Sequence, residues 1–540
     1  MALPLHDRAM DTDSAELVRL TLLEGGASPQ LVASLIPSRP LEEGEQYRFH
    51  FDMTKCIGCR SCEVACNEQN GNPADIKWRR VGELEGGVYP QVSRTYLSMG
   101  CNHCISADCL KGCPVDAYKK DPLTGIVMHS ADACIGCQYC VWNCPYSVPQ
   151  FNPERGVVGK CDMCRERLID NREPACANAC PENAIQIEIV NKIAWTEDYS
   201  LAESPGMPAA GQTISTTRIT LPQSSTAATA WLERVDTGAI ALEHAHSSLV
   251  VMTTAMQASF GLLCGLALVR NLDAVSLLLL LLVTAAALNV SVFHLGRPAY
   301  AWRALKMWRR SWLSREVLCF TLFFGFVTAA TLCAWTPLLP WHLQLQRLVA
   351  PLAWAAIASG VAGTYASASI YLVKARPSWN MVHTPLDFFL SSALVGIPLL
   401  SVLARPALII TAFLHRHGFE VARPHFTLYP RLLALTAGVW ILNQMVRVAR
   451  LRASAIFEHR ASFHHLRGEQ LWWCVALSWI CALQAVLFLF APLHWMALLS
   501  LLAATAAVLL NRYLFFVSVV PLSMGLTFIR DRGTHGRAAA

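Results

Sequence analysis

The chain has 540 residues and combines 54% hydrophobic with only 15% charged residues, which excludes a single ordinary soluble domain. The formal net charge of +6 is modest, and the basic residues are concentrated in particular loops. This distribution indicates how the chain is oriented in a membrane and disfavours a nucleic-acid-binding protein. Most of the 21 cysteines lie in the first 180 residues, whereas apolar runs fill the sequence after about residue 247. These features predict a soluble half followed by a membrane half.

Residues 1–46 form an extension before the first motif. They contain neither a twin-arginine pair nor an apolar stretch with a small-residue cleavage site, so we expect this end to remain unexported. The spacing of Leu17, Leu20 and Leu23 permits a short amphipathic helix over residues 14–23. A partly ordered extension is the alternative.

Sixteen cysteines then follow in four groups of four. Two groups read C-x2-C-x2-C-x3-C, and the last cysteine of three groups is followed by proline. Three closely spaced thiolates can hold three iron corners of a cuboidal cluster, while the fourth cysteine binds a neighbouring cluster. The candidate ligands are Cys56, Cys59, Cys62, Cys66, Cys101, Cys104, Cys109, Cys113, Cys134, Cys137, Cys140, Cys144, Cys161, Cys164, Cys176 and Cys180.

Zinc and disulfides are the alternative uses of these cysteines. Zinc prefers one tetrahedral set of four ligands, usually two pairs separated by a longer loop, and four-cysteine runs ending in Cys-Pro fit that pattern poorly. Disulfides are disfavoured because the sequence shows no cleavable signal peptide and its thiols lie three residues apart. The spacing therefore favours iron–sulfur clusters.

Strand-like segments flank the cysteine groups. Residues 47–53 alternate as YRFHFDM, and similar segments read GIVMHS before Cys134 and AIQIEIV after Cys180. The recurring strand, loop and short helix predict an α+β domain over residues 47–190, built as a doubled ferredoxin-like unit.

The segments KCIGCRSCEVAC, CNHCISADCLKGCP, CIGCQYCVWNCP and CDMC…CANACP resemble the four-cluster ferredoxin subunits of the dimethyl sulfoxide reductase family of molybdoenzymes. The resemblance covers about residues 46–190 and implies four [4Fe–4S] clusters, with the first cysteine group paired with the fourth and the second with the third. The implied sets are Cys56, Cys59, Cys62 and Cys180; Cys66, Cys161, Cys164 and Cys176; Cys101, Cys104, Cys109 and Cys144; and Cys113, Cys134, Cys137 and Cys140.

Such clusters move single electrons, so substrate chemistry belongs elsewhere. The sequence offers no phosphate-binding glycine loop and no nucleophile constellation. The resemblance implies a separate catalytic subunit that carries the molybdopterin.

Residues 191–246 are rich in Ser, Thr, Ala and Pro, and we expect them to form a linker. In the family, similar tails lie against the catalytic subunit; a plain tether is the alternative. Residues 231–245 are expected to form an amphipathic helix on the membrane surface.

The remainder, residues 247–530, predicts an all-α polytopic domain of eight transmembrane helices in the lipid bilayer. Each apolar segment is near the roughly 20 residues needed to cross a bilayer, although the sixth is short. The segments are about 248–269, 275–293, 317–336, 348–372, 388–412, 430–446, 471–491 and 495–520.

Loop charges predict the orientation of these helices. The loops on the cysteine-rich side carry sixteen Lys and Arg residues and the opposite loops carry six. We therefore predict a multi-pass protein of the bacterial inner (cytoplasmic) membrane whose iron–sulfur domain faces the cytoplasm. This orientation favours relatives that oxidise sulfite and reduce quinone over exported dimethyl sulfoxide reductases.

The segments FHLGRPAYAW, SWLSREV and IYLVKARPSW resemble the haem-free anchor subunit of dimethyl sulfoxide reductase, over about residues 245–530. That resemblance implies exchange of electrons and protons with a quinone, either menaquinone or ubiquinone, and no haem. It places quinone-site groups at His294 and Glu316, with Tyr371 as a further candidate. The alternative for His294 is a histidine at the membrane interface without a role in quinone binding. The alternative for Glu316 is an acidic residue in the first turn of a helix, where the helix dipole stabilises its charge.

Arg512 is a candidate on physical grounds. We expect it midway along the last span, where insertion of an arginine costs about 2.5–3.5 kcal/mol. A bound quinone, Glu316 or a water-filled proton path would compensate that cost. A structural pair with Asn443 or Gln444 is the alternative.

The sequence thus predicts an electron-transfer and membrane-anchor subunit that connects a molybdopterin enzyme to the quinone pool. An electron-transfer module of a proton-translocating complex is the alternative, and it would require charged pairs inside several spans, whereas Arg512 is the only deep charge that the sequence reveals. A zinc-binding structural membrane protein is a third possibility. Five further cysteines, Cys264, Cys319, Cys333, Cys474 and Cys481, are expected to be packing residues.

Overall fold

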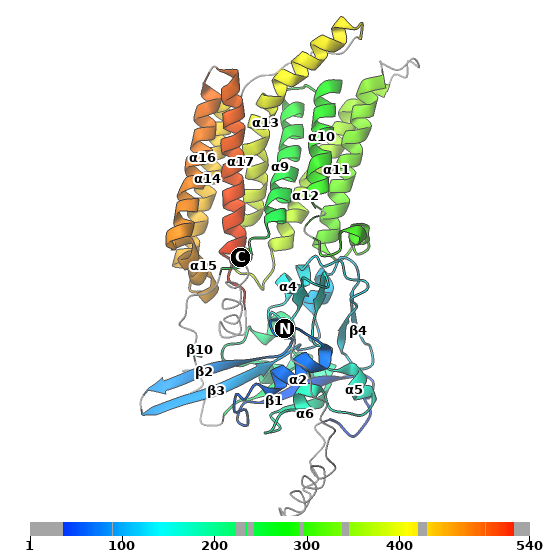
Figure 1. The fold of residues 1–540 in the computed structure, drawn as a ribbon, viewed down its shortest axis with the longest axis vertical. Helices are drawn as coiled ribbons and strands as arrows, with labels where there is room; N and C mark the ends of the chain where they lie inside the picture. The colour runs from blue at the N-terminus through cyan, green and yellow to red at the C-terminus, as the bar shows by residue number, and fades with distance from the viewer. Residues whose placement is uncertain are drawn as a thin grey trace, which may run out of the picture.

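A β-rich domain lies beneath a bundle of long helices in the computed structural model (Figure 1). Each part has a hydrophobic core, and the core of the bundle includes Tyr139 and Trp142 from the β-rich domain. The structure describes residues 36–88, 90–222, 233–234, 242–291, 293, 295–336, 345–419, 429–491 and 493–522. His294 and the expected helix over residues 14–23 lie outside these described residues. The described residues of the surface helix expected over 231–245 are not helical, since Glu233–Arg234 form strand β10 and residues 242–245 have no regular secondary structure.

The centre of the β-rich domain is a three-stranded sheet in the order β8-β1-β9. Strand β1 (Glu45–Asp52) pairs antiparallel with β8 (Ile185–Asn191) and parallel with β9 (Arg218–Thr220). Alternating residues of β1 face the core, since Phe49 and Phe51 are buried. The expected strands at both ends of the cysteine region therefore lie side by side in one sheet.

Three smaller β structures complete the domain. A second sheet has the order β10-β2-β3, and two hairpins follow the second and third cysteine groups. Their strands are β2 (Arg80–Val88), β3 (Gln91–Met99), β10 (Glu233–Arg234), β4 (Tyr118–Lys120), β5 (Val127–His129), β6 (Gln150–Asn152) and β7 (Val157–Gly159).

Short helices accompany the cysteine groups. They are α2 (Ser61–Asn70), α3 (Asp108–Gly112), α4 (Tyr139–Asn143), α5 (Arg165–Ile169) and α6 (Ala175–Asn178). Gly58 and Gly136 precede two of these helices with φ of 71° and 69°. A glycine adopts this left-handed conformation without the steric cost of a Cβ, so the loop can curl around the space between its cysteines.

Residues 192–222 belong to the β-rich domain, which departs from the linker expected over 191–246. Helix α7 (Lys192–Glu197) and the 3₁₀ turns η1 (Ser200–Ala202) and η2 (Ala210–Gln212) lead into β9. Thr216 and Thr217 are buried, and their hydroxyls donate to the backbone oxygen and the Oδ1 of Asn102 at 2.6 and 2.8 Å. The polar composition suggested a linker because hydrogen bonds that satisfy buried threonines cannot be read from composition.

The second half forms an all-helical bundle. Its elements are α9 (Ser247–Leu268), α10 (Ala274–Ser291), η5 (Pro298–Leu305), α11 (Trp312–Trp335), η7 (Leu345–Leu348), α12 (Val349–Tyr371), α13 (His383–Arg416), α14 (Pro430–Ala453), α15 (Phe457–Arg467), α16 (Glu469–Phe490) and α17 (His494–Val517). Among the described residues, seven helices are long and apolar enough to cross a membrane, and the apolar helix at 274–290 is shorter. An eighth span through α10 therefore stays a prediction.

Two helices differ from the apolar segments that predicted them. Helix α14 continues to Ala453, well beyond the short segment expected over 430–446. Helix α13 begins at His383, five residues before the expected segment, and has 34 residues with Pro398 and Pro406 inside it. Its far end leans away from the bundle in Figure 1. The earlier start matters because it brings Asp387 into the helix.

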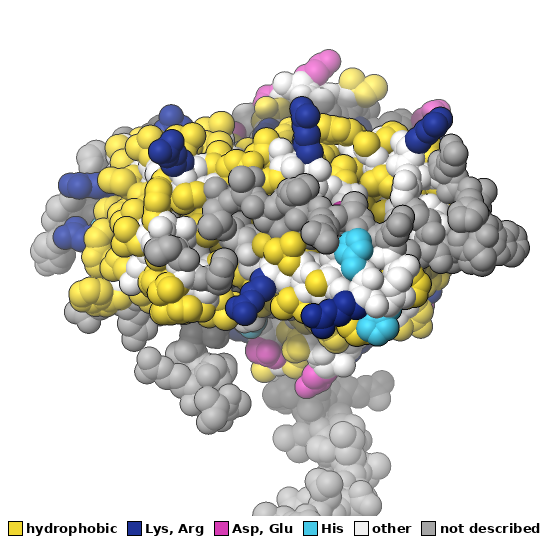
Figure 2. All heavy atoms as spheres, turned by 90° about the horizontal axis from the view of Figure 1, so that it is seen from above, with side chains coloured by type: hydrophobic (Ala, Val, Ile, Leu, Met, Phe, Trp, Pro, Cys, Tyr) yellow, Lys and Arg dark blue, Asp and Glu magenta, His cyan; other side chains and the backbone are white. Residues whose placement is uncertain are grey.

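The outer surface of the bundle suits lipid. Large apolar side chains such as Leu282, Leu332 and Trp354 are exposed along it. Figure 2 views the bundle from the end far from the β-rich domain, and hydrophobic groups dominate that view with Lys and Arg scattered among them.

Candidate functional site

The first and fourth cysteine groups meet at the sheet. Cys56, Cys59 and Cys62 line one cavity together with Cys180. The loop turns at Gly58, and α2 then carries Cys62 into the wall of the cavity. This is the first of the four sets that the family resemblance implied.

A second set joins the same two groups. The Cys66 thiol lies within electrostatic reach of Cys176 and Cys164, and that of Cys161 within reach of Cys66 and Cys176. The buried guanidinium of Arg79 faces this set and also reaches the thiol of Cys62 in the first set. A single buried cation therefore stands between two sets of thiols.

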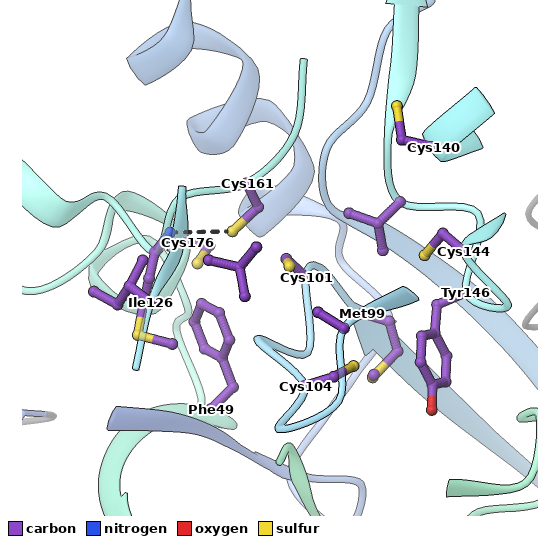
Figure 3. Close-up of a cluster of buried hydrophobic side chains, with 14 of the residues drawn as sticks. Phe49, Met99, Cys101, Cys104, Ile126, Cys140, Cys144, Tyr146, Cys161 and Cys176 are labelled. Atoms are coloured by element: carbon purple, nitrogen blue, oxygen red, sulfur yellow. Dashed lines mark hydrogen bonds between the residues drawn. The ribbon is translucent and has the colours of Figure 1, made fainter. Parts of the chain in front are cut away.

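The second and third groups form the other two sets. One cavity is lined by Cys101, Cys104, Cys109 and Cys144, and another by Cys113, Cys134, Cys137 and Cys140. Figure 3 shows Cys161 and Cys176 on one side, Cys104 and Cys144 on the other, and Cys101 between them. All sixteen cysteines are thus distributed into the four implied sets.

The surroundings of these thiols fit a multi-iron cofactor. Burial raises the pKa of Cys62 and Cys144 to about 11 and that of Cys66 to about 12, so thiolates at these positions need nearby positive charge. Backbone amides of Ala117 and Ala184 donate to the sulfurs of Cys113 and Cys180, each at 3.3 Å. Such hydrogen bonds stabilise thiolate ligands and tune cluster potentials.

A single metal ion fits this arrangement less well. Within the described part of the chain, no three His, Cys, Asp or Glu side chains close on one ion-sized point. Twelve of the sixteen cysteines line the walls of three cavities, four to each, which fits one cuboidal cluster per cavity.

The loop between α10 and α11, called the clasping loop below, contacts the cysteine-rich domain through hydrogen bonds to two of its cysteine groups. The Arg297 amide donates to the Ile135 carbonyl at 3.1 Å, beside the third cysteine group. The Ser311 hydroxyl donates to the Gly112 carbonyl at 2.6 Å, beside the second group. The set containing Cys113 therefore lies toward the membrane bundle.

Charged groups reinforce the same contact. Asp116 faces Arg310 at 3.4 Å and Lys306 at 3.9 Å, and Arg303 donates to the Asp132 carbonyl at 2.9 Å. Part of the basic excess on this side thus serves docking between the two domains.

Backbone segments approach most closely where three glycines meet. Gly136 follows Cys134, Gly156 lies in the β6–β7 turn, and Gly296 belongs to the clasping loop. A Cβ added at Gly136 would lie 2.9 Å from the Gly296 Cα, which leaves no room for a side chain.

The short helix α4 inserts an aromatic side chain into the bundle. Trp142, two residues beyond Cys140, is buried with its ring centroid 5.5 Å from that of Trp379 and 5.3 Å from that of His246. Tyr371 packs against Trp379 at 5.4 Å, and the Trp379 indole donates to the Phe515 carbonyl at 2.7 Å. One continuous aromatic cluster therefore joins the cysteine-rich domain to the membrane helices.

Two of the expected quinone residues lie at this junction. Glu316 in the first turns of α11 is buried, and the Ser367 hydroxyl is in hydrogen-bonding contact with its carboxyl group. The phenols of Tyr371 and Tyr139 are both within electrostatic reach of Glu316. The structure thus brings Glu316 and Tyr371 together beside α4.

Arg512 has a partner that the sequence pattern did not predict. It lies five residues before the end of α17, so it is nearer the cysteine-rich domain than the expected midpoint. Its Nη2 is 3.3 Å from Asp387 Oδ2, and its guanidinium lies 3.8 Å from the centroid of the Phe388 ring. Arg512 is therefore not the only deep charge, and its ion-pair partner is Asp387 rather than Asn443 or Gln444.

Comparisons with known proteins agree with these two parts. Residues 92–189 match the model of a 4Fe-4S dicluster domain. Residues 244–517, about half of the chain, match the model of the DMSO reductase anchor subunit (DmsC). The protein belongs to the DmsC family of anchor subunits. It is accordingly an integral membrane protein in which an iron–sulfur electron-transfer part and a DmsC anchor are fused.

The iron–sulfur part has curated relatives in molybdoenzyme complexes. It is 35% identical over 158 residues to one polypeptide of the anaerobic dimethyl sulfoxide reductase of Haemophilus influenzae, covering 28% of this chain and 77% of the relative. It is 36% identical over 156 residues to the corresponding polypeptide of Escherichia coli, covering 27% and 76%. Against one polypeptide of the sulfite dehydrogenase of Allochromatium vinosum, the identity is 33% over 154 residues, covering 25% and 64%.

Three features of this DmsC-family protein had weak sequence signals. Asp387 lay just outside an apolar window, and a search for acids within one turn of such windows would have found it. Trp142 lies inside the third cysteine motif, and the motif itself gives no indication that an aromatic residue there contacts the membrane helices. Thr213 donates to the Cys104 sulfur at 3.1 Å from a stretch that composition assigned to a linker.

Proposed function

We propose that the chain is the electron-transfer and membrane-anchor subunit of a molybdopterin oxidoreductase, and that it connects a separate catalytic subunit with membrane quinone. The observation that carries this proposal is the position of α4. This helix carries Cys140 and packs Trp142 against Tyr371 of the anchor. The same five-residue helix thus belongs to a candidate cluster site and borders the expected quinone site.

The four cysteine sets are proposed to hold four [4Fe–4S] clusters. Bound there, the clusters would supply one-electron transfer along the domain. The residues of the chain provide the thiolates, the sulfur hydrogen bonds and the buried cation Arg79 between two of the sets. Because Arg79 is fully buried, its charge is screened little by water.

The quinone site is proposed to lie beside α4, with Glu316, Tyr371 and Arg512 as its described polar groups. His294, which lies outside the described residues, is proposed as a further group on the strength of the family resemblance. A carboxyl group and a histidine suit the hydrogen bonding and proton exchange that quinone oxygens require. Trp142 and Trp379 cover Tyr371 with apolar surface and keep bulk water from its ring. No haem is expected in the anchor.

The partner and the orientation rest on different arguments. Relatives named as parts of dimethyl sulfoxide reductase and sulfite dehydrogenase support a catalytic partner of that class, with either reaction open to it. The apolar segments support eight spans in the bacterial inner membrane, and the loop charges support an iron–sulfur domain in the cytoplasm.

The purified, anaerobically handled protein provides the test. We expect about sixteen irons per chain and rapid oxidation of the reduced clusters by added quinone. Clearly fewer irons would reject the four-cluster assignment, and clusters that do not exchange electrons with quinone would reject the anchor role. A reporter fused within residues 223–232, between the iron–sulfur domain and the first membrane helix, that is active only in the periplasm would overturn the orientation.

A further inference from the structure

A second polar centre lies inside the bundle around Asp387. This residue is 4% exposed and occupies the second turn of α13. Its Oδ1 accepts hydrogen bonds from Asn511, at 3.0 Å, and from Gln444, and its Oδ2 faces Arg512 at 3.3 Å. Helices α13, α14 and α17 therefore converge on one buried carboxylate.

Several buried donors next to this carboxylate still lack an acceptor among the described residues. They are Nε and Nη1 of Arg512 and Nε2 of Gln257. Nε2 of His383, which is an acceptor when Nδ1 donates to Asn443, also has no partner among the described residues. Arg512, Gln257 and His383 are 0%, 3% and 6% exposed, and Gln257 Oε1 accepts from Arg512 at 3.3 Å. Buried donors nearly always have partners, so this arrangement fits ordered water between the side chains.

The polar centre extends toward the iron–sulfur side of the bundle. His383 begins α13, one turn before Asp387, so the two side chains share a helix face. Its ring Nδ1 lies 2.7 Å from Asn443 Oδ1, and Asn443 donates to the His383 carbonyl at 3.2 Å. Buried polar groups thus lie at the start of α13, around His383, and one turn further on, around Asp387.

The other side of the centre adjoins the proposed quinone site. The Arg512 guanidinium lies over Phe388, and the ring of Tyr371 packs against Phe388 with centroids 5.7 Å apart. Other charged or titratable groups around Asp387 are His383 on its own helix and Arg447 of α14, which lies over Phe515 and within electrostatic reach of Asp387. The carboxylate is thus close to Tyr371 yet separated from it by an aromatic ring.

We propose that Asp387 carries protons between the quinone beside Tyr371 and the water on the iron–sulfur side. This inference rests on the quinone function proposed above. Formation of one quinol takes two electrons from the reduced clusters and two protons from the bulk water on the iron–sulfur side. Each proton passes His383, binds the Asp387 carboxylate and continues through bound water to a quinone oxygen. Oxidation of quinol reverses each step. Arg512 holds the carboxylate in place as a positioning residue.

A proton carrier differs from a purely structural ion pair in its kinetics. The test follows oxidation of the dithionite-reduced, full-length protein by a soluble short-chain quinone, over a range of quinone concentrations. Asp387→Asn is expected to lower the maximal rate about 100-fold, as loss of a proton-transfer group does, while the half-saturating quinone concentration changes little. Asp387→Glu should recover most of the rate.

Matched controls separate the outcomes. Ser392→Ala removes a buried hydroxyl from the same helix, which donates to the Phe388 carbonyl at 3.0 Å, and should leave the rate unchanged. If Asp387→Asn fails to assemble, the double variant Asp387→Asn, Arg512→Gln removes both charges. Because Arg512 is also a proposed quinone-site group, the rate of the double variant is compared with that of Arg512→Gln alone, and the double variant should be slower; equal rates would overturn the role of Asp387. A redox-induced infrared difference spectrum should contain a carboxyl band that the two variants with Asp387→Asn lack.

Each result decides between the proposals. Quinone that oxidises the wild-type clusters, combined with a wild-type rate in Asp387→Asn or in the double variant, would overturn the role of Asp387 and leave the quinone function standing. A variant that only raises the half-saturating concentration would make Asp387 a quinone ligand instead. Wild-type clusters that quinone fails to oxidise would reject the quinone function itself.

Discussion

The ring of Trp142 in the iron–sulfur domain lies 5.9 Å, centroid to centroid, from the ring of Tyr371 in the membrane bundle. The two residues are more than 200 positions apart in the sequence, and they join the domain cores. Substitution of Trp142 therefore tests whether this junction is needed for electron exchange between the proposed clusters and quinone.

Replacement of Trp142 by Ala should weaken docking, because removal of a buried aromatic side chain typically costs about 3–5 kcal/mol. We expect at least a tenfold slower oxidation of reduced clusters by quinone, together with unchanged iron content. Stopped-flow spectroscopy measures the rate, and Trp142→Phe is the matched variant that keeps the aromatic contact. Equal rates in the wild type and Trp142→Ala would contradict a role for this junction.

Cys140→Ser should remove one cluster and lower the iron content by about four per chain, because its set would lose a thiolate ligand. Metal analysis and electron paramagnetic resonance measure the loss. Cys264→Ser is the control, since Cys264 is half-buried in α9 and belongs to no cysteine set. An unchanged spectrum in Cys140→Ser would exclude this set as a ligand sphere.

Glu316→Gln and His294→Ala should each reduce quinone-linked turnover about 100-fold, because each removes a group able to exchange a proton with quinone. Both variants should keep the full iron content. Thr328→Ala is the control on the same helix as Glu316, since the Thr328 hydroxyl only donates to the Phe324 carbonyl of its own helix. Normal turnover in both variants would place the quinone elsewhere.

Arg512→Ala should abolish quinone-linked turnover and also destabilise the bundle by about 3–5 kcal/mol, because it leaves the buried Asp387 unpaired. Thermal unfolding in detergent measures the second effect. Arg431→Ala, at the far end of α14 where the side chain is exposed, should change neither property. Unaltered thermal stability of Arg512→Ala would show that the pair contributes little.

Acid should loosen the β8-β1-β9 sheet through Glu188. Although burial raises its pKa, the hydrogen bond from His50 and the charges of Arg48 and Arg218 bring the pKa below its usual value. The carboxylate pairs with Arg218 at 2.8 Å and Arg48 at 2.9 Å. A lowered pKa stabilises the fold above the value of the unfolded chain, and this stabilisation is lost as the pH falls through the folded value.

Glu188→Gln should therefore lower the Tm by about 2–4 °C at neutral pH and flatten its decline in acid. Differential scanning calorimetry from pH 7 to acidic conditions provides the measurement. Glu182→Gln, an exposed acid on the loop before β8, is the control. A decline of the same steepness in the wild type and Glu188→Gln would assign the acid sensitivity to other groups.

The family and the two-part architecture were predictable because cysteine spacing and long apolar runs are local patterns. The sequence resemblance also grouped Cys56 with Cys180 across more than 100 residues, and the structure brings these two together. Ligation by the sixteen cysteines remains a prediction for metal analysis.

Local patterns could not predict the polar interior. Asp387 pairs with Arg512 across 124 intervening positions, and hydropathy placed the acid outside its helix. The buried Thr213 and Thr216 were assigned to a linker, because their partners Cys104 and Asn102 lie on a distant loop. In both cases a hydrogen bond or an ion pair with a segment remote in the sequence compensates the free-energy cost of burying a polar side chain.

The contact of Gly136, Gly156 and Gly296 has a kinetic consequence. Main-chain atoms of the two domains lie so close there that neither domain has room for a Cβ. In the proposed relay, electron transfer slows as the separation between cluster and quinone grows. Alanine at any of the three positions is therefore expected to push the domains apart and slow this transfer, while the cysteine sets and the quinone-site residues stay chemically unchanged.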